Sequence, residues 1–337
     1  MTRPVSCEEW TVSSPGKIPP DVFNRHTPLV LRGLVSHWPA VQKTQGSIAQ
    51  SAAYLLQYYQ GTPLGLFFGP PEIRGRFFYN SDFTGFNFEK VAAQLDIILK
   101  KIDDVAQQAA PPAIFVGGTQ LESCLPGFTD DNAPLALPKP NPLNGLWIGN
   151  QTRVAPHNDL PSNIACCVAG RRRFTLFPPE QLENLYVGPL DFTLSGQAIS
   201  LVDINEPNIE KFPRYAEAQK KAIVAELSPG DAIFVPTLWW HQVEALSTFN
   251  ILVNYWWRES PDYVDSPLKA LKYALMTVGQ LNTEEKRHWQ HIFHHYLFAD
   301  KATSSAHIPA HARGSLDKID ALLMRELRAS LLEGLKR

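Results

Sequence analysis

The segment that decides the fold runs from Pro156 to Phe177 and reads PHNDLPSNIACCVAGRRRFTLF. Residues 163–168 and 174–177 within it are rich in apolar, strand-forming side chains, and the Ala169-Gly170 pair between them has the chemistry of a turn. Two such runs joined by a short turn are typical of a β-hairpin. The segment therefore predicts a sheet, not a helix bundle, at the centre of the chain.

The sequence on both sides extends this pattern of short strands. Its 28 prolines and 18 phenylalanines favour strands separated by rigid turns. Turn chemistry recurs at Ser228-Pro229-Gly230-Asp231, between two apolar runs. The further candidate strands are 146–148, 222–227, 232–235 and 249–257. Strands at this spacing predict a mainly β fold with flanking helices, in which residues 141–260 form an antiparallel jelly roll.

Residues 1–140 show a mixed α/β pattern and are expected to contribute to the jelly roll. A strand is expected from Thr27 to Gly33, followed by a helix that Ser47 caps and that ends near Gln60. A second amphipathic helix is expected from Phe88 to Ile102. Since a chain of 337 residues exceeds the usual size of one core, we expect one large domain with appended helices, or two unequal domains.

Residues 261–337 are expected to form a C-terminal helical segment. Asn282 and Glu285 have the spacing of a capping box, and Ser315 is a candidate cap for a last helix with leucines at helical spacing up to Leu335. These helices carry more apolar surface than two or three of them can hide. We therefore expect a homodimer that packs through residues 316–335, although the helices could instead fold back onto the jelly roll.

Composition limits the partners and the compartment. The net charge is -2 and no long basic run occurs, which does not favour nucleic acid as a partner. No stretch approaches the roughly 18 apolar residues that span a bilayer, so we expect a cytoplasmic protein without membrane contact. None of the 4 cysteines has Cys-x-x-Cys spacing. Cys166 and Cys167 would point to opposite faces of a strand, which favours two buried free thiols.

Candidate metal ligands lie at the start of the deciding segment. Side chains two residues apart in an extended chain point the same way, so His157 and Asp159 can reach one ion. The best third ligand is His241, which follows a turn and a strand later in the same β-region. Two imidazoles and one carboxylate form the facial triad of non-haem iron(II) oxygenases. By itself His-x-Asp could be a surface pair, and His241 could be a core histidine beside two tryptophans.

The sequence around these residues resembles the JmjC-like cupin family (cupin-8 type), which includes an asparaginyl hydroxylase. The resemblance rests on His157-Asn158-Asp159 with Gly170–Pro179, on Pro229–Pro236 with Trp239-Trp240-His241, and on Asn254-Tyr255-Trp256. It covers about residues 20–258 in patches. The family implies a double-stranded β-helix that binds iron(II) and 2-oxoglutarate and hydroxylates a protein or small-molecule substrate.

The resemblance also assigns roles to single residues. His157, Asp159 and His241 match the iron ligands, and Asn163 and Asn254 match positions that hydrogen-bond 2-oxoglutarate. Arg172 stands where a lysine usually holds the distal carboxylate of the co-substrate, a role that a guanidinium can fill through two hydrogen bonds. In the alternative interpretation Asn163 satisfies a turn, Asn254 is a core amide, and Arg172 is a solvated charge at a strand edge.

Two departures from the family pattern leave other functions open. Phe115 and Val154 occupy positions where a Tyr and a Thr hydroxyl would assist the distal carboxylate. The chain could therefore be a cupin-fold metal-binding scaffold without turnover, or a metal-dependent cupin enzyme that needs no 2-oxoglutarate. The four histidines of residues 288–295 have helical spacing but no carboxylate among them, so we interpret them as a solvated or interface face.

Overall fold

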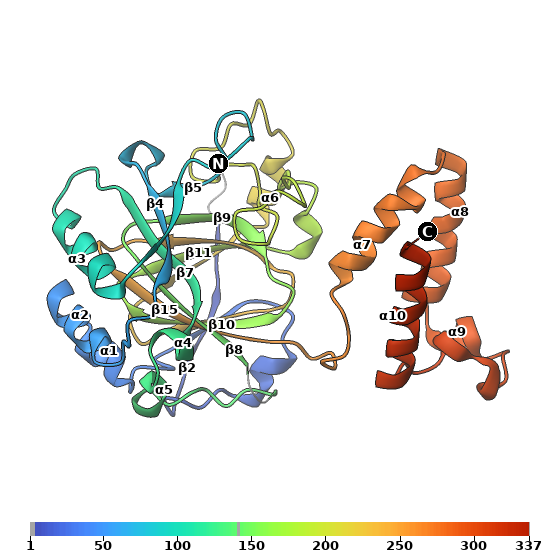
Figure 1. Cartoon of the computed structure of the whole chain (residues 1–337), viewed down its shortest axis with the longest axis horizontal. Helices are drawn as coiled ribbons and strands as arrows, with labels where there is room; N and C mark the ends of the chain where they lie inside the picture. Colours follow the sequence, from blue (N-terminus) through green and yellow to red (C-terminus); the bar gives the residue numbers. More distant parts are fainter. Residues whose placement is uncertain (1–3, 140–141, 337) are drawn as a thin grey trace. The chain divides into compact units, whose positions relative to one another are not determined.

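Two β-sheets packed face to face build the first part of the chain (Figure 1). The structure is a computed structural model that describes residues 4–139 and 142–336. Internal contacts divide the chain into two units, Met1–Arg258 and Glu259–Arg337. Strands from the first 140 residues lie in the same sheets as those of residues 141–260. The predicted mainly β fold with flanking helices is confirmed.

Strands that are distant in sequence lie next to each other in both sheets. Across the six-stranded sheet the order is β1 (Val5–Ser6), β12 (Ile223–Leu227), β11 (Arg172–Phe177), β14 (Trp240–Ala245), β9 (Arg153–Asn158) and β5 (Arg76–Phe77). Across the nine-stranded sheet it is β2 (Glu8–Thr11), β3 (Leu29–Arg32), β13 (Ala232–Val235), β10 (Ser162–Ala169), β15 (Asn250–Trp257), β8 (Leu143–Gly149), β7 (Ala113–Gln120), β4 (Leu64–Gly69) and β6 (Glu89–Ala93).

The predicted β-hairpin in the deciding segment is wrong. Its strands exist as β10 and β11, but β10 pairs with β13 and β15, whereas β11 pairs with β12 and β14. The turn at Gly170 instead carries the chain from one sheet to the other. Gly170 has φ +71°, and a Cβ there would lie 2.4 Å from the Phe249 carbonyl oxygen, so this corner needs glycine. Such corners between sheets are what a jelly roll requires.

Side chains alternate between the two faces of β10, as the sequence predicted. Cys166 packs in the large cluster on one face of the nine-stranded sheet, and Cys167 packs in the cluster between the sheets. All four cysteines are buried and free, and burial raises the pKa of Cys7 to about 11. The prediction of buried free thiols at 166 and 167 is confirmed.

Helices cover the outer face of the nine-stranded sheet (Figure 1). They are α1 (Pro39–Lys43), α2 (Ile48–Leu56), α3 (Leu95–Val105), α4 (Leu121–Cys124) and α5 (Phe128–Asp131), with turns η1 (Pro20–Asn24) and η2 (Pro71–Ile73). Later in the unit come η3 (Pro179–Gln181) and α6 (Tyr215–Lys220). Ser47 and Gln50 form a capping box on α2, as expected. The helix expected from Phe88 begins only at Leu95, because residues 89–93 pair with β4 as a strand.

The second unit contains helices only, within the part of the chain that the structure describes. They are α7 (Pro267–Met276), α8 (Thr283–Phe293), α9 (Lys301–Ser305) and α10 (Ala321–Leu335), with shorter turns η4 (Val278–Gln280), η5 (His294–Phe298), η6 (Ala310–Ala312) and η7 (Gly314–Leu316). The capping box of Asn282 and Glu285 on α8 is present. The expected cap at Ser315 is wrong: Asp320 caps α10 through the N–H groups of Leu322 and Leu323, and Leu316 belongs to the preceding turn.

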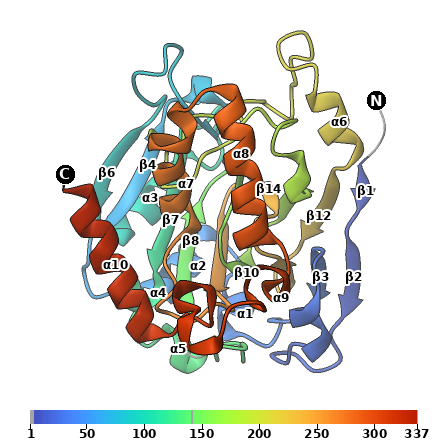
Figure 2. The ribbon, with the colours of Figure 1, turned by 90° about the vertical axis from the view of Figure 1, so that its right-hand side faces the viewer.

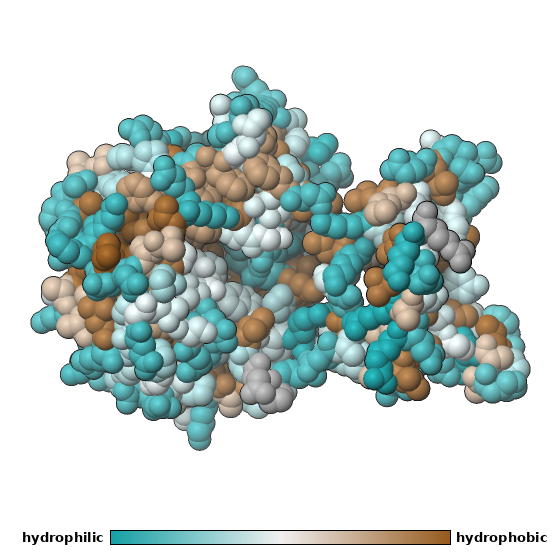
Figure 3. All heavy atoms as spheres, viewed as in Figure 1, coloured by the Kyte–Doolittle hydropathy of each residue, from teal (hydrophilic) through white to brown (hydrophobic). Residues whose placement is uncertain are grey.

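The helices of this unit leave their apolar side chains uncovered. No described residue of α7, α8 or α10 is buried, and α10 stands apart from α7 and α8 in Figure 2. Apolar side chains appear on the surface of the unit in Figure 3. The side chains of Leu331 and Phe298 are 53% and 75% exposed. None of the helices in residues 4–139 and 142–336 has the length and apolar character that crossing a membrane requires.

The homodimer remains a prediction, and substitution of exposed leucines on α10 tests it. Replacing Leu331 and Leu332 by arginine should convert a dimer into a monomer in sedimentation velocity at micromolar concentration, because two charges would enter an apolar interface. The control is the pair Arg325→Ala and Glu326→Ala on the same helix, which should leave the dimer intact. A wild-type chain that sediments as a monomer contradicts the prediction.

Candidate metal centre and its cavity

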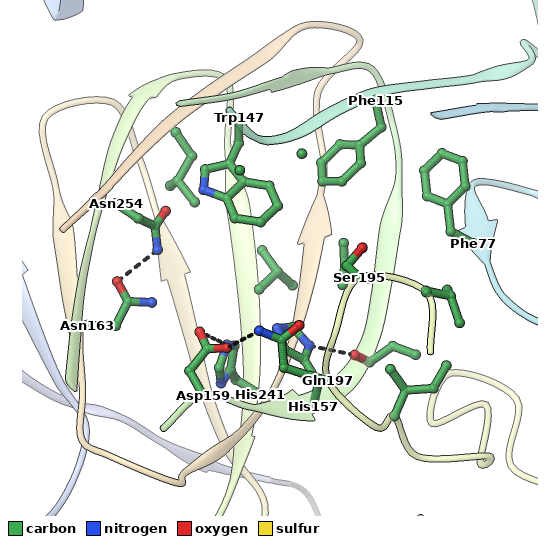
Figure 4. Close-up of a pocket in the computed structure, with 18 of the residues that line it drawn as sticks. Phe77, Phe115, Trp147, His157, Asp159, Asn163, Ser195, Gln197, His241 and Asn254 are labelled. Atoms are coloured by element: carbon green, nitrogen blue, oxygen red, sulfur yellow. Dashed lines mark hydrogen bonds and ion pairs between the residues drawn. The ribbon is translucent and has the colours of Figure 1, made fainter. Parts of the chain in front are cut away.

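Adjacent strands of the six-stranded sheet bring the three predicted ligands together. His157 on β9 and His241 on β14 are direct partners in the antiparallel register, with ring centroids 4.4 Å apart. Asp159 follows β9 and places Oδ2 3.9 Å from Nε2 of His241. One possible ligand atom from each of the three residues lies within 4.8 Å of the others. Figure 4 shows the three side chains converging at one end of a cavity.

Both imidazoles are held in the orientation that a metal ligand needs. Nδ1 of His157 lies 2.9 Å from the Ala155 carbonyl oxygen, and Nδ1 of His241 lies 2.9 Å from that of Trp239. Because a carbonyl only accepts hydrogen bonds, each Nδ1 is the donor in its contact, and each Nε2 is the nitrogen left for a metal ion. Burial, and then the neighbouring His157, lower the pKa of His241 well below its ordinary value. This ring is therefore neutral at pH 7 and able to ligate.

Asp159 is fixed by two donors that the sequence did not single out. The Trp256 indole Nε1 donates to Oδ2 at 3.1 Å, and the Gln197 amide Nε2 donates to Oδ1 at 3.2 Å. Trp256 lies two residues beyond Asn254 on β15, so alternation alone could have placed both on the inner face. Gln197 lies in an irregular loop between η3 and α6, and no periodic pattern could have predicted its position.

The backbone next to Asp159 is tied to the loop that precedes β14. The Leu238 N–H donates to the Asp159 carbonyl oxygen at 2.8 Å, and the Thr237 hydroxyl donates to that of Leu160. Leu238 has φ +61°, an uncommon conformation for a residue with a Cβ. Two hydrogen bonds thus connect the segment that carries Asp159 to the loop that precedes His241.

The cavity in front of the trio has a volume of about 400 Å³, within the range of small-molecule sites. Arg172, Asn163 and Asn254, the other three predicted site residues, also line it. Nδ2 of Asn254 donates to Oδ1 of Asn163 at 2.8 Å, and Oδ1 of Asn254 is buried without a partner (Figure 4). Phe115 and Val154 line the same cavity and bring no hydroxyl.

Arg172 is the unusual group of this cavity. It is 3% exposed, and its Nε and Nη2 atoms are buried without a hydrogen-bond partner. Burial lowers its pKa to about 10, so the guanidinium still carries its charge at neutral pH. Arg171 and Arg173 point to the other face of β11 and both pair with Glu226. Arg172 therefore faces the cavity while its two neighbours face away from it.

The chain matches the family model of the cupin-like domain over residues 15–263. It belongs to the cupin-like domain family. This cupin-like protein is 29% identical to lysine-specific demethylase JMJ31 of Arabidopsis thaliana over 154 residues, 44% of this chain and 28% of the relative. It is 34% identical to HSPB1-associated protein 1 of Homo sapiens over 142 residues, 42% of this chain and 28% of the relative. It is 26% identical to lysine-specific demethylase 8 of Xenopus tropicalis over 242 residues, 68% of this chain and 48% of the relative.

The matches therefore cover about half or less of each relative's own length. The longest of them, to the Xenopus protein, covers two thirds of this cupin-like chain. They support the family and the fold of the first unit, and they leave the substrate of this cupin-like protein open.

The geometry of the trio predicts how metal binding will respond to mutation. His157→Ala, Asp159→Ala and His241→Ala should each abolish stoichiometric binding of iron(II) or zinc(II) in calorimetry, because two remaining ligands cannot hold the ion. His291→Ala on α8 is the control and should bind metal as the wild type does. Unchanged metal affinity in all three cavity variants would show that the trio is not the metal site.

The hydrogen bond from Trp256 predicts a milder effect. Trp256→Phe keeps an aromatic ring but removes the donor to Asp159, so the carboxylate loses part of its orientation. Metal affinity should fall roughly 10–100-fold, the usual effect of losing such a supporting partner. Trp289→Phe in the second unit is the matched control. An unaltered affinity in Trp256→Phe would mean that Asp159 needs no support from the indole.

Proposed function

We propose that this chain is an iron(II)- and 2-oxoglutarate-dependent oxygenase that hydroxylates a protein or small-molecule substrate. The observation that carries the proposal is a single cavity that joins the His157, Asp159 and His241 trio to a buried arginine without a partner. The trio and Arg172 are also the residues that the resemblance to JmjC-like cupins assigns to iron and to the co-substrate.

The donor set suits iron(II). Two imidazoles and one carboxylate on one side of an ion leave its other positions open. They cancel only part of its charge, which favours an anionic chelating ligand. Iron(II) with bound 2-oxoglutarate supplies the chemistry that divides dioxygen, so that one oxygen atom enters the substrate as a hydroxyl, the other enters succinate, and carbon dioxide is released.

Arg172 supports 2-oxoglutarate as the co-substrate through its charge. A buried guanidinium without an anion is costly, and no carboxylate from the described residues pairs with it. A ligand carboxylate could accept two parallel hydrogen bonds from it. The cavity thus holds a cation that a diacid would neutralise.

The register supports a diacid of this length. Arg172 pairs with Ala245, four residues beyond His241 on β14, which corresponds to about 13 Å along the strand. The long arginine side chain bridges part of this separation. We propose that a five-carbon diacid chelated at the metal end bridges the remainder.

Asn163 and Asn254, which line the cavity, are proposed to hydrogen-bond the co-substrate through their amide N–H groups, because ionised 2-oxoglutarate offers only acceptors. Phe115 and Val154 cannot assist the distal carboxylate. Arg172 would therefore hold that carboxylate without the two hydroxyls of the family pattern, and its loss should weaken binding more severely than where hydroxyls share the role.

The main rival is a metal-binding cupin scaffold without turnover, which the missing hydroxyls at Phe115 and Val154 favour. The unpaired Arg172 in the same cavity opposes it. A metal-dependent enzyme that needs no 2-oxoglutarate is a weaker alternative. Detection of succinate with iron(II), 2-oxoglutarate and dioxygen separates the proposed function from both.

We also propose a reducing, cytoplasmic setting, since the four thiols are buried and form no disulfide.

The names of two relatives describe lysine-specific demethylases. This specificity is not carried over to the present chain, because the alignments are partial and the identities are 29% and 26%. The substrate must be argued from the cavity itself.

The decisive prediction concerns Arg172→Ala. Removing the partner of a buried carboxylate typically costs about 2–5 kcal/mol, so the affinity for 2-oxoglutarate should fall roughly thirtyfold or more. Metal binding should persist, and succinate formation should be lost at 2-oxoglutarate concentrations that saturate the wild type.

Arg171→Ala is the matched control, because Arg171 is the exposed neighbour on the opposite face of β11. It should bind and consume 2-oxoglutarate as the wild type does. Normal 2-oxoglutarate affinity in Arg172→Ala would remove the basis of the proposed function, and metal binding without succinate in the wild type would favour the scaffold.

A further inference from the structure

We propose that Trp147 is a positioning residue of the co-substrate site, whose indole N–H fixes the direction of the hydrogen bond between Asn254 and Asn163. In the direction that it sets, Asn163 presents an N–H group to the cavity, which suits a ligand that offers only acceptors. The inference rests on the proposed function for the identity of that ligand, 2-oxoglutarate. Neither residue spacing nor the family resemblance gave Trp147 a role.

Two buried polar atoms of the cavity residues have no hydrogen-bond partner among the described residues and complement each other. One is Nε1 of Trp147, which can only donate, and the other is Oδ1 of Asn254, which can only accept. Because both atoms are buried, water does not satisfy them where they lie, and each unpaired group costs free energy. A bond between the two removes both costs.

The strand register makes Trp147 and Asn254 neighbours. Asn254 on β15 pairs with Gly145 on β8, and Trp147 follows two residues later on the same face of β8. Diagonal neighbours of this kind lie within reach of an aromatic side chain. The sheet itself therefore brings the two side chains together.

Packing against β7 sets the orientation of the indole. Its benzene edge lies over a bulge in β7 at Gly117 and Gly118, where added Cβ atoms would come within 3.2 Å of Cζ3 and 3.4 Å of Cη2. Gly118 has φ +62°, a conformation that favours glycine. Figure 4 shows the nitrogen of Trp147 turned toward Asn254, whose oxygen points back toward the indole.

The polarity of the amide pair decides what the cavity presents to a ligand. Nδ2 of Asn254 donates to Oδ1 of Asn163 at 2.8 Å, and the amide nitrogen of Asn163 is turned into the cavity (Figure 4). If both amides turned over, Asn163 would donate to Asn254 and present its oxygen to the cavity. That oxygen would repel the oxygens of an ionised keto acid.

The indole of Trp147 distinguishes between these two polarities. In the reversed pair the amide nitrogen of Asn254 would face the indole nitrogen, and two donors would oppose each other. In the observed pair an acceptor faces the indole. A donor that cannot turn over thus fixes two amides that can, and the chain of donors runs from Trp147 through Asn254 and Asn163 to the ligand.

The indole proton of Trp147 tests the first bond of this chain. The protein is loaded with zinc(II), which has no redox chemistry, and contains no 2-oxoglutarate. The proton–nitrogen NMR signal that is absent from Trp147→Phe should lie downfield and exchange slowly with water. Asn254→Ala removes the acceptor, so the signal should move upfield and exchange roughly tenfold faster or more. Asn208→Ala, at an exposed asparagine outside the cavity, is the control and should leave the signal unchanged.

Co-substrate affinity tests the rest of the chain. Calorimetry of the zinc-loaded form should show roughly three- to tenfold weaker 2-oxoglutarate binding in Trp147→Phe, the range of one net hydrogen bond. Because Trp147 acts through Asn254, the same substitution should have no further effect in an Asn254→Ala background, whereas a purely steric role of the ring gives additive effects.

Trp38→Phe is the matched control for the affinity. The Trp38 indole also donates a hydrogen bond, to the Ala133 carbonyl oxygen, but it packs in the cluster on the other face of the nine-stranded sheet. This variant should bind 2-oxoglutarate as the wild type does.

The inference is overturned by an indole signal that ignores Asn254→Ala, by an unchanged affinity in Trp147→Phe, or by additive effects in the double variant. A signal that responds to added 2-oxoglutarate but not to Asn254→Ala assigns the indole to the ligand and also overturns it. The Asn254→Ala variant keeps the indole. It therefore decides even if Trp147→Phe does not fold, with the signal assigned from its own ring protons.

The two proposals fail separately. The indole signal is measured without co-substrate, so it decides the role of Trp147 even if the wild type binds no 2-oxoglutarate and the proposed function is wrong. If the wild type binds 2-oxoglutarate and forms succinate while the indole ignores Asn254→Ala, the oxygenase proposal stands and Trp147 has no positioning role.

Discussion

The antiparallel register between β9 and β14 is the constraint on which the site depends. It sets His157 directly opposite His241, and both rings project to the inner side of the six-stranded sheet. A slip of one residue would turn one histidine to the outer face, since side chains alternate along a strand. The position of β14 is secured by its other neighbour, because β11 pairs with it through six residue pairs. Phe174 and Leu176 of β11 in turn pack between the sheets.

The same alternation separates two kinds of arginine on β11. On the outer face Arg171 and Arg173 share Glu226, and Arg173 also approaches Glu244 at 3.7 Å. The pairs with Glu226 are partly exposed and contribute little to stability, yet they give both Arg171 and Arg173 a counterion. On the inner face Arg172 has no counterion. One strand therefore carries both a satisfied surface network and an unsatisfied buried cation, and only the second needs a ligand.

Local patterns predicted what depends on the periodicity of a single segment. The opposite faces of Cys166 and Cys167, the inward Arg172, and the pairing of His157 with Asp159 all follow from the alternation of an extended chain. Whether a segment forms a helix or a strand was harder to predict where its apolar residues fit both periodicities. Residues 89–93 carry apolar side chains that suit a helix, but they pair with β4 and form a strand. The Gly170 turn had hairpin chemistry, and only the packing of two sheets makes it a corner.

Features that join distant segments could not be derived from the sequence. Gln197 reaches Asp159 from an irregular loop, and the aromatic rings that line the cavity come from β4, β5, β7 and β8. Neither feature has a regular residue spacing from which it could be predicted. The third ligand, His241, was a candidate because it follows a turn and a strand in the same β-region, and the family resemblance then supplied the long-range pairing that residue spacing lacks.

The loop that carries Gln197 is held by hydrogen bonds from Tyr79 to the Phe192 carbonyl oxygen and from Lys90 to that of Leu194, and this attachment has an evolutionary consequence. The same loop lines the cavity with Leu194 and donates from Gln197 to Asp159, so one segment shapes the cavity and supports a candidate metal ligand. A lineage that exchanged this loop to accept a new substrate would disturb the metal site in the same step. Divergence of specificity in such a protein is therefore easier through single side chains that line the cavity than through insertion or replacement of the loop.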